Sequence, residues 1–126
     1  MANAKLKALF DSDVLLDFLD GFPPAAAELA RYRERNTSII SWMELLAGAR
    51  NKTDEETRRG FLDQFNVLSL TMEVAEEAVA LRRGHRVKLP EAIIWATAIV
   101  HGCLLVSRNT KDFPSNDPGV RFPYRR

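Results

Sequence analysis

The chain has 126 residues, of which 46% are hydrophobic and 28% are charged, a composition that excludes a disordered protein and suits one globular domain spanning residues 1–126. The formal net charge of +1 gives no overall basic character for binding nucleic acid, so any basic surface has to be local. Cys103 is the only cysteine, which excludes an internal disulfide and a multi-cysteine metal site. No apolar stretch approaches the roughly 20 residues of a membrane span, and the N-terminus lacks a signal-peptide pattern. We therefore expect a cytoplasmic protein with no membrane contact.

Short apolar or β-branched runs alternate along the chain with longer stretches of helical pattern. The expected strands are 6–10, 37–41, 66–70 and 103–107, with a short fifth expected at 119–124. The expected helices are 14–19, 23–35, 42–50, 53–65, 72–83 and 90–102. Strands separated by helices predict βαβ units. The expected fold class is therefore α/β, a three-layer α/β/α sandwich around a mostly parallel sheet of four or five strands.

Four acidic residues occupy positions that a parallel sheet can bring to one edge. Asp11 comes directly after the first strand, and Asp112 follows the fourth strand through the polar turn SRNTKD. Glu44 is expected in the first turn of the helix after the second strand, and Glu91 opens the helix that leads into the fourth. Because parallel strands share a carboxyl edge, three of these acids are expected to meet there. Glu91 joins them if the N-terminus of its helix points to the same edge.

Four carboxylates in one cleft repel each other strongly. Each like-charged pair at about 5 Å and an effective dielectric of about 20 costs roughly 3 kcal/mol. A divalent cation among the acids removes this cost. Oxygen ligands without cysteines or paired histidines favour Mg²⁺ or Mn²⁺ over zinc. Such ions commonly activate water and stabilise charge in phosphoryl-transfer chemistry.

Each acid also has a purely structural explanation. Asp13, close to Asp11, can cap the helix that follows, and Ser41 and Glu44 have the spacing of a capping box. Glu91 suits the positive end of its helix, and Asp112 can be an ordinary turn residue. These explanations treat the acids one at a time. They leave open why acids follow successive strands at the same edge.

Three segments carry a resemblance to a known family. They are LFDSDVLLDFL, SIISWMELLAGAR and KLPEAIIWATAIVHGCLLVSRNTKDF. Their order and spacing resemble a PIN domain, and more closely the toxin component of VapBC toxin–antitoxin pairs. The resemblance extends from about Leu6 to Phe113, and the combination of motifs is specific, although any single acid is a weak signal.

The resemblance implies a PIN-like fold and a Mg²⁺- or Mn²⁺-dependent endoribonuclease that cleaves RNA phosphodiester bonds with water activated in an acidic pocket. By motif position, the catalytic and metal-binding acids are Asp11, Glu44, Glu91 and Asp112. The supporting polar residues are Ser12, Asp13, Ser107 and Asn109. The family usually has Asp where this chain has Glu91, and the longer side chain matters for an ion that needs ligands at about 2.1 Å. Activity can therefore be retained, shifted toward manganese or reduced.

Basic residues gather near two of the acidic motifs. The segment RRGHRVK precedes Glu91, and two cations flank the turn before Asp112. The residues expected to hold RNA phosphates are Arg82, Arg83, Arg86, Lys88, Arg108 and Lys111. A solvated helix end is the alternative explanation for the first group. The C-terminal RFPYRR adds three arginines and can be a loose tail.

The resemblance also implies partners: a homodimer, a cognate VapB-type antitoxin that forms a hetero-oligomer with it, and an RNA substrate. Two alternative functions stay open. A catalytically weakened PIN module would act by partner binding, with Glu91 as the mark of a damaged site. A haloacid dehalogenase-type phosphatase would use Asp11 as nucleophile and Asp13 as acid/base, because LFDSDV fits a strand followed by D-x-D.

Overall fold

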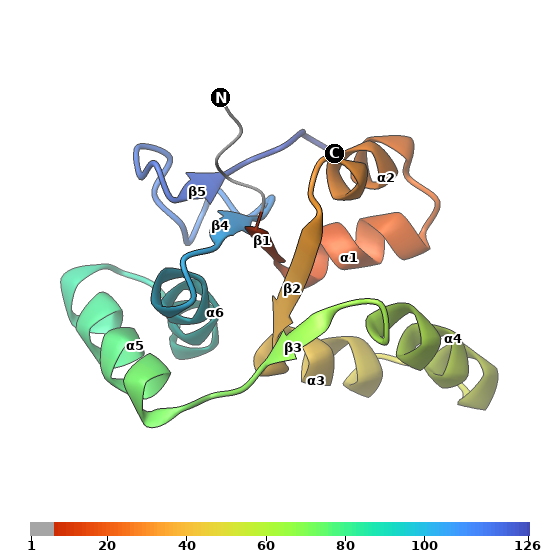
Figure 1. Cartoon of the computed structure of the whole chain (residues 1–126), viewed down its shortest axis with the longest axis horizontal. Coiled ribbons are helices and arrows are strands. Elements are labelled where there is room, and N and C mark those ends of the chain that lie inside the picture. Colours follow the sequence, from red (N-terminus) through yellow and green to blue (C-terminus); the bar gives the residue numbers. More distant parts are fainter. Residues whose placement is uncertain (1–6) are drawn as a thin grey trace.

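Five parallel strands form the central sheet of the computed structural model, which describes residues 7–126 (Figure 1). In chain order the strands are β1 (Lys7–Phe10), β2 (Glu34–Ser38), β3 (Asn66–Leu68), β4 (Leu104–Val106) and β5 (Val120–Arg121). Their order across the sheet is β3-β2-β1-β4-β5, and all four neighbouring pairs are parallel. The carboxyl ends of the strands therefore lie at one edge. Leu6, the first residue of the strand expected at 6–10, lies outside the described residues.

The helices between the strands are short. They are α1 (Ser12–Leu19), α2 (Pro23–Ala30), α3 (Ile39–Ala47), α4 (Lys52–Leu62), α5 (Met72–Gly84) and α6 (Leu89–Val100). The longest, α5, has 13 residues. Within residues 7–126 no helix has both the length and the apolar character needed to cross a bilayer.

Helices cover both faces of the sheet, with α5 and α6 together on one side and α1 to α4 on the other (Figure 1). Side chains alternate along β1, so that Leu9 packs with α5 and α6 while Phe10 packs with α1 to α4. Trp95 of α6 lies in the first cluster and Phe61 of α4 in the second. The predicted three-layer α/β/α sandwich is confirmed.

The second strand begins three residues earlier than predicted, at Glu34 instead of residue 37, and α2 ends at Ala30 instead of residue 35. The prediction followed the β-branched pair Ile39–Ile40, which the structure places in the first turn of α3. Ser38 caps that helix, because its hydroxyl accepts a hydrogen bond from the backbone N–H of Ser41 at 3.1 Å.

The actual β2 sequence, ERNTS, is polar and still lies largely buried in the sheet. Its buried side chains donate hydrogen bonds to carbonyl groups of β1, Asn36 to Ala8 at 3.1 Å and Thr37 to Phe10 at 3.0 Å. A polar strand is stable here because its side chains are satisfied by the neighbouring strand.

The C-terminal segment 121–126 is fixed to α1 and α2, so the description as a loose tail is wrong. Glu28 of α2, which is 4% exposed, accepts hydrogen bonds from Arg121 Nε at 2.7 Å and Nη2 at 3.0 Å. Asp17 of α1, 2% exposed, accepts hydrogen bonds from the Tyr124 hydroxyl at 2.8 Å and from Arg126 Nη1 at 2.7 Å. Two buried carboxylates thus hold the end of the chain against the helices.

Candidate active site

A hollow of about 450 Å³ opens at the carboxyl edge of the sheet. Side chains from α1, α3, α6 and the turn after β4 line it. They are Asp11, Ser12, Asp13, Leu16, Glu44, Glu91, Arg108 and Asn109. Three of the four predicted metal ligands therefore share one hollow, together with three of the four predicted supporting residues.

Asp11 lies where β1 ends and α1 begins. Its backbone N–H donates to the carbonyl of Val106 at 2.9 Å, which brings it beside the end of β4. Its carboxylate accepts hydrogen bonds from the Ser12 N–H and the Ser107 hydroxyl, both at 2.7 Å. Burial, and the neighbouring charge of Asp13, outweigh these bonds and raise the pKa of Asp11 to about 7. Near neutral pH the carboxyl group is therefore poised between its two protonation states.

Asp13 lies in the first turn of α1, and the N-cap of that helix is Asp11. One carboxylate oxygen of Asp13, Oδ2, accepts the backbone N–H of Arg108 at 3.1 Å. The other oxygen, Oδ1, is buried without a hydrogen-bond partner among the described residues. Burial raises the pKa of Asp13 despite the hydrogen bond from Arg108. The capping explanation for Asp13 is therefore wrong, and its carboxylate faces the turn after β4.

Glu44 belongs to the second turn of α3, not the first, because the helix begins at Ile39. Its Oε1 accepts a short hydrogen bond of 2.5 Å from the Ser12 hydroxyl on α1. The capping box proposed for Ser41 and Glu44 is absent from this helix, since Ser38 provides the cap. The carboxylate instead reaches across to α1 and the hollow.

Glu91 lies in the first turn of α6, whose N-terminus points toward the acidic hollow. Its Oε1 is buried and has no hydrogen-bond partner among residues 7–126. Burial is the main cause of a raised Glu91 pKa, and the charges of Asp112 and Glu44 raise it further. The N-terminus of α6 therefore does lie at the carboxyl edge of the sheet, as is needed for Glu91 to join the other acids.

Asp112 is held by Asn109 at the side of the hollow and does not line it. Asn109 Nδ2 donates to Asp112 Oδ2 at 2.9 Å, and the Asp112 N–H donates back to Asn109 Oδ1 at 3.0 Å. The Asn109 N–H in turn donates to the Ser107 hydroxyl at 2.9 Å. Asp112 is near enough to Glu91 to raise its pKa. The turn after β4 therefore links the fourth acid to the other three.

The carboxylates fit a hard divalent cation by their chemistry, although their present spacing is wide. In the described part of the chain, no three Asp, Glu, His or Cys side chains gather closely enough to hold a metal ion. Yet Asp13 and Glu91 each keep a buried oxygen without a hydrogen-bond partner in the described range 7–126, and Asp11 and Glu91 have raised pKa values. Oxygen-only donors short of positive charge are what Mg²⁺ or Mn²⁺ would satisfy.

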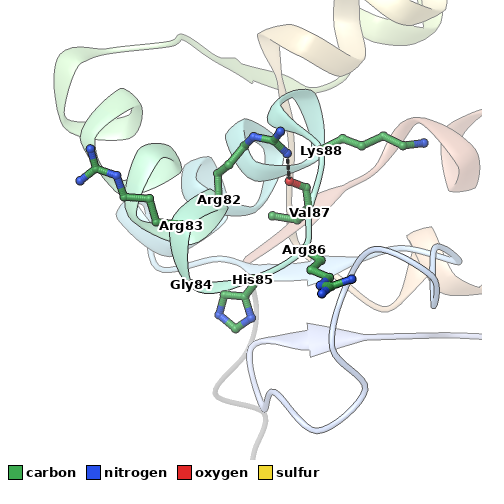
Figure 2. A pocket seen from close by; sticks show the side chains of 7 residues that line it. All are labelled: Arg82, Arg83, Gly84, His85, Arg86, Val87 and Lys88. Carbon is green, nitrogen blue, oxygen red and sulfur yellow. Dashed lines mark hydrogen bonds between the residues drawn. The ribbon is translucent and has the colours of Figure 1, made fainter.

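The basic segment 82–88 surrounds a hollow of about 620 Å³ but does not point its cations to one place. Figure 2 shows Arg83 and Lys88 extending in opposite directions, while Arg82 turns back to the loop. Arg82 Nη1 donates to the carbonyl of Val87 at 2.6 Å, which closes that loop. Lys88, the N-cap of α6, lies near enough to Glu91 to favour its charged form.

Arg108 lines the acidic hollow, but its guanidinium group is turned to Asp17. Nε and Nη2 donate to the two Asp17 oxygens at 2.5 and 3.0 Å. Lys111 is exposed on the turn next to Asp112. Asp17 had no role in the sequence analysis, and the one signal for it is an acid inside the apolar run VLLDFL.

Comparison with known proteins identifies the family. The PIN domain family model matches residues 8–117. A chain of a toxin–antitoxin complex from Klebsiella pneumoniae is 41% identical, with a TM-score of 0.87, and the match covers 94% of this chain and 98% of that one. FitAcB from Neisseria gonorrhoeae has 23% identity and a TM-score of 0.75, with 92% and 97% of the two chains covered.

VapBC2 from Rickettsia felis, bound to a DNA fragment of its promoter, has 18% identity and a TM-score of 0.67, with 90% and 94% covered. The similarity to FitAcB and to VapBC2, at these low identities, shows a shared fold. A search of curated proteins gives no match. The family match spans nearly all of β1 to β4, the acidic hollow and the turn that holds Asp112. The chain belongs to the PIN-domain family.

Proposed function

We propose that this chain is a metal-dependent endoribonuclease, the toxin of a type II toxin–antitoxin pair. One observation carries the proposal: Asp11, Asp13 and Glu91 line one hollow, where burial raises their pKa values and where Asp13 and Glu91 each keep a buried carboxylate oxygen without a hydrogen-bond partner among the described residues. The likeness to a chain of the Klebsiella pneumoniae toxin–antitoxin complex supports the toxin assignment.

In this proposal Asp11, Glu44, Glu91 and Asp112 hold Mg²⁺ or Mn²⁺. The bound ion would activate water and stabilise the charge that develops at the RNA phosphate. The supporting residues orient the acids, since Ser107 donates to Asp11 and Ser12 donates to Glu44. The longer Glu91 side chain serves in place of the usual aspartate, because Glu91 lines the hollow and keeps one carboxylate oxygen without a hydrogen-bond partner among the described residues.

The phosphatase alternative has lost its support. The chain matches a PIN domain, and Asp13, the acid/base of that alternative, is held by the Arg108 N–H and the turn after β4. The catalytically weakened module remains the alternative that an experiment has to exclude.

We further propose that an antitoxin of the VapB type covers the hollow and that the toxin forms a homodimer. Exposed apolar side chains lie on the three helices that carry the acids: Leu16 on α1 is 37% exposed and lines the hollow, Met43 on α3 is 46% exposed and Leu89 on α6 is 49% exposed. An apolar partner segment would bury them. A lysine or arginine from that segment, placed against the acids, would inhibit by displacing the metal.

The test is cleavage of total RNA by the purified chain, freed of antitoxin, in EDTA, Mg²⁺ and Mn²⁺. Discrete fragments that require metal are the expected result. Asp11→Asn is expected to lower the rate about a thousandfold, equivalent to roughly 4 kcal/mol of transition-state stabilisation. Cleavage that persists in Asp11→Asn would point to a contaminating nuclease.

Glu91→Asp separates the enzyme from the weakened module. Intact RNA under every condition, with cleavage restored by Glu91→Asp, would show that Glu91 has damaged the site. Intact RNA with both proteins would overturn the ribonuclease proposal.

A further inference from the structure

A second hollow, of about 680 Å³, lies between the turn after β4 and the C-terminal segment. Arg108, Thr110 and Ser115 line it from the turn, and Phe122 and residues 124–126 line it from the C-terminal segment. No acidic side chain of the described residues contributes to the lining. The hollow is therefore basic, with aromatic and hydroxyl groups added.

Both walls are tied to the same buried carboxylate. Asp17 accepts hydrogen bonds from Arg108 on one wall and from Tyr124 and Arg126 on the other. Tyr124 also packs edge-on against Phe22, with ring centroids 5.2 Å apart. Because each wall is anchored to α1, the hollow exists before any ligand binds, which lowers the entropic cost of binding.

Positive charge in this hollow is left available. Arg125 is exposed and makes no hydrogen bond or ion pair with any residue in the range 7–126. Arg108 uses Nε and Nη2 on Asp17, so Nη1 has no partner among the described residues. Guanidinium groups beside half-buried aromatic rings and exposed hydroxyls suit a phosphate with its attached base.

The two hollows share one residue. Arg108 lines both, and its backbone N–H contacts Asp13 in the acidic one. A strand with one phosphate at the acids would pass over Arg108 to reach the second hollow. We propose that the second hollow is a nucleotide subsite that holds single-stranded RNA next to the bond to be cleaved. This inference rests on the proposed ribonuclease function, and it identifies the surface that the RNA substrate contacts beyond the acidic hollow.

The experiment measures binding in EDTA, where the proposed cleavage is absent. Fluorescein-labelled oligouridylates of roughly 4 and roughly 12 nucleotides bracket common single-strand site sizes. Arg125→Glu and Thr110→Glu change exposed residues on opposite walls. Arg33→Glu is the control with the same charge change as Arg125→Glu, because Arg33 is exposed and precedes β2 at the amino edge of the sheet.

Both subsite variants are expected to weaken binding of the longer oligonucleotide about tenfold, while the control changes it less than about twofold. Arg125→Glu is also expected to reduce the slope of log affinity against log salt by roughly 0.7 for each phosphate that the variant no longer neutralises. Equal binding by all three variants would overturn the subsite whether or not RNA is cleaved. Selective weakening supports it even if the cleavage test fails. Binding of the proposed antitoxin is measured with the same variants. If RNA binding is unchanged and antitoxin binding is weakened, the hollow holds an acidic protein segment and the RNA assignment is overturned.

Discussion

Two groups of buried carboxylates in this molecule have opposite surroundings. Asp17 accepts hydrogen bonds from two arginines and a tyrosine, and although burial alone would raise its pKa, these partners hold it below the usual range. Glu28 accepts hydrogen bonds from Arg121 and Tyr32, and these partners likewise hold its pKa below the usual range. In the acidic hollow, burial raises the pKa of Asp11 to about 7 and no arginine side chain among the described residues pairs with it.

The difference does not come from a shortage of cations, because the chain has 18 lysines and arginines. Arg108 shows this most clearly. Its backbone N–H contacts Asp13, yet its guanidinium group turns to Asp17, and Asp13 keeps a buried oxygen without a partner in the described structure. Arginines thus neutralise the carboxylates that join distant segments, whereas Asp13 and Glu91 in the hollow each keep a buried oxygen without a hydrogen-bond partner among residues 7–126.

We call Asp17 and Glu28, with their arginine and tyrosine partners, the neutralised group. Asp17→Ala is expected to have the largest effect on it. The substitution leaves Arg108, Tyr124 and Arg126 without their shared acceptor, and removing one partner from a buried ionic cluster costs about 3–5 kcal/mol. Urea unfolding at neutral pH measures this loss. Asp20→Ala is the control, because Asp20 also pairs with Arg126 but is 66% exposed, and a loss of about 0–1 kcal/mol is expected. Equal losses in the two variants would mean that the Asp17 cluster adds no more stability than an exposed ion pair.

The pH dependence of stability that comes from Asp11 should be opposite in sign to that from Asp17 and Glu28. Its pKa rises from 3.8 to about 7 on folding, so without metal the folded protein binds the extra proton between these pH values. Stability therefore falls as pH rises from about 4 to 7, by roughly 4 kcal/mol at about 1.4 kcal/mol for each tenfold change in proton affinity. Asp17 and Glu28, with lowered pKa values, contribute stability that is lost as pH falls below their usual range.

Asp11→Asn isolates the contribution of this one carboxyl group. In urea unfolding with EDTA, the stability of the variant relative to the original chain is expected to increase steadily from about pH 4 to 7. A difference that stays constant with pH would show that Asp11 is ionised in both the folded and the unfolded chain.

A divalent cation bound in the hollow should neutralise its carboxylates, as arginines already do for Asp17 and Glu28. At about one hundred times its dissociation constant, Mn²⁺ or Mg²⁺ is expected to stabilise the fold by about 2.7 kcal/mol, because the unfolded chain has no assembled site. The effect should weaken below about pH 7, where Asp11 holds its proton. Thermal unfolding with increasing metal measures the shift in Tm, and Asp11→Asn is the control that should lose most of it. An unchanged Tm in the original chain would argue against a metal site in the hollow.

The sequence predicted the layers and the location of the acids because both depend on local pattern. Apolar runs and helical spacing place the elements, and an acid directly after a strand, such as Asp11, lies at the carboxyl edge of any parallel sheet. The family resemblance to a PIN domain is confirmed by the match over residues 8–117. The assignment of Asp11, Glu44, Glu91 and Asp112 as metal ligands stays a prediction.

Contacts between distant segments account for what the sequence did not show. The buried polar side chains of β2 are satisfied because Asn36 and Thr37 donate hydrogen bonds to β1, a contact that is evident only once the two strands are paired. The C-terminal segment 121–126 is too short to show a helical or strand pattern, and the hydrogen bonds that fix it come from Asp17 and Glu28, far away along the chain. Patterns within a short window carry no information about either.

The finest comparison within the neutralised group uses its two tyrosines. Tyr124 donates to Asp17 and Tyr32 donates to Glu28, both at 2.8 Å. Replacing either by Phe removes one hydrogen bond to a charged group and keeps the ring, so each variant is expected to lose about 1.5–2 kcal/mol in urea unfolding. The acceptors differ in what else they anchor, because Asp17 also holds Arg108, which borders the acidic hollow. Tyr124→Phe should therefore shift the affinity for the longer oligonucleotide as well, whereas Tyr32→Phe should change stability alone. If both variants altered RNA binding equally, the Asp17 cluster would have no special connection to the substrate side.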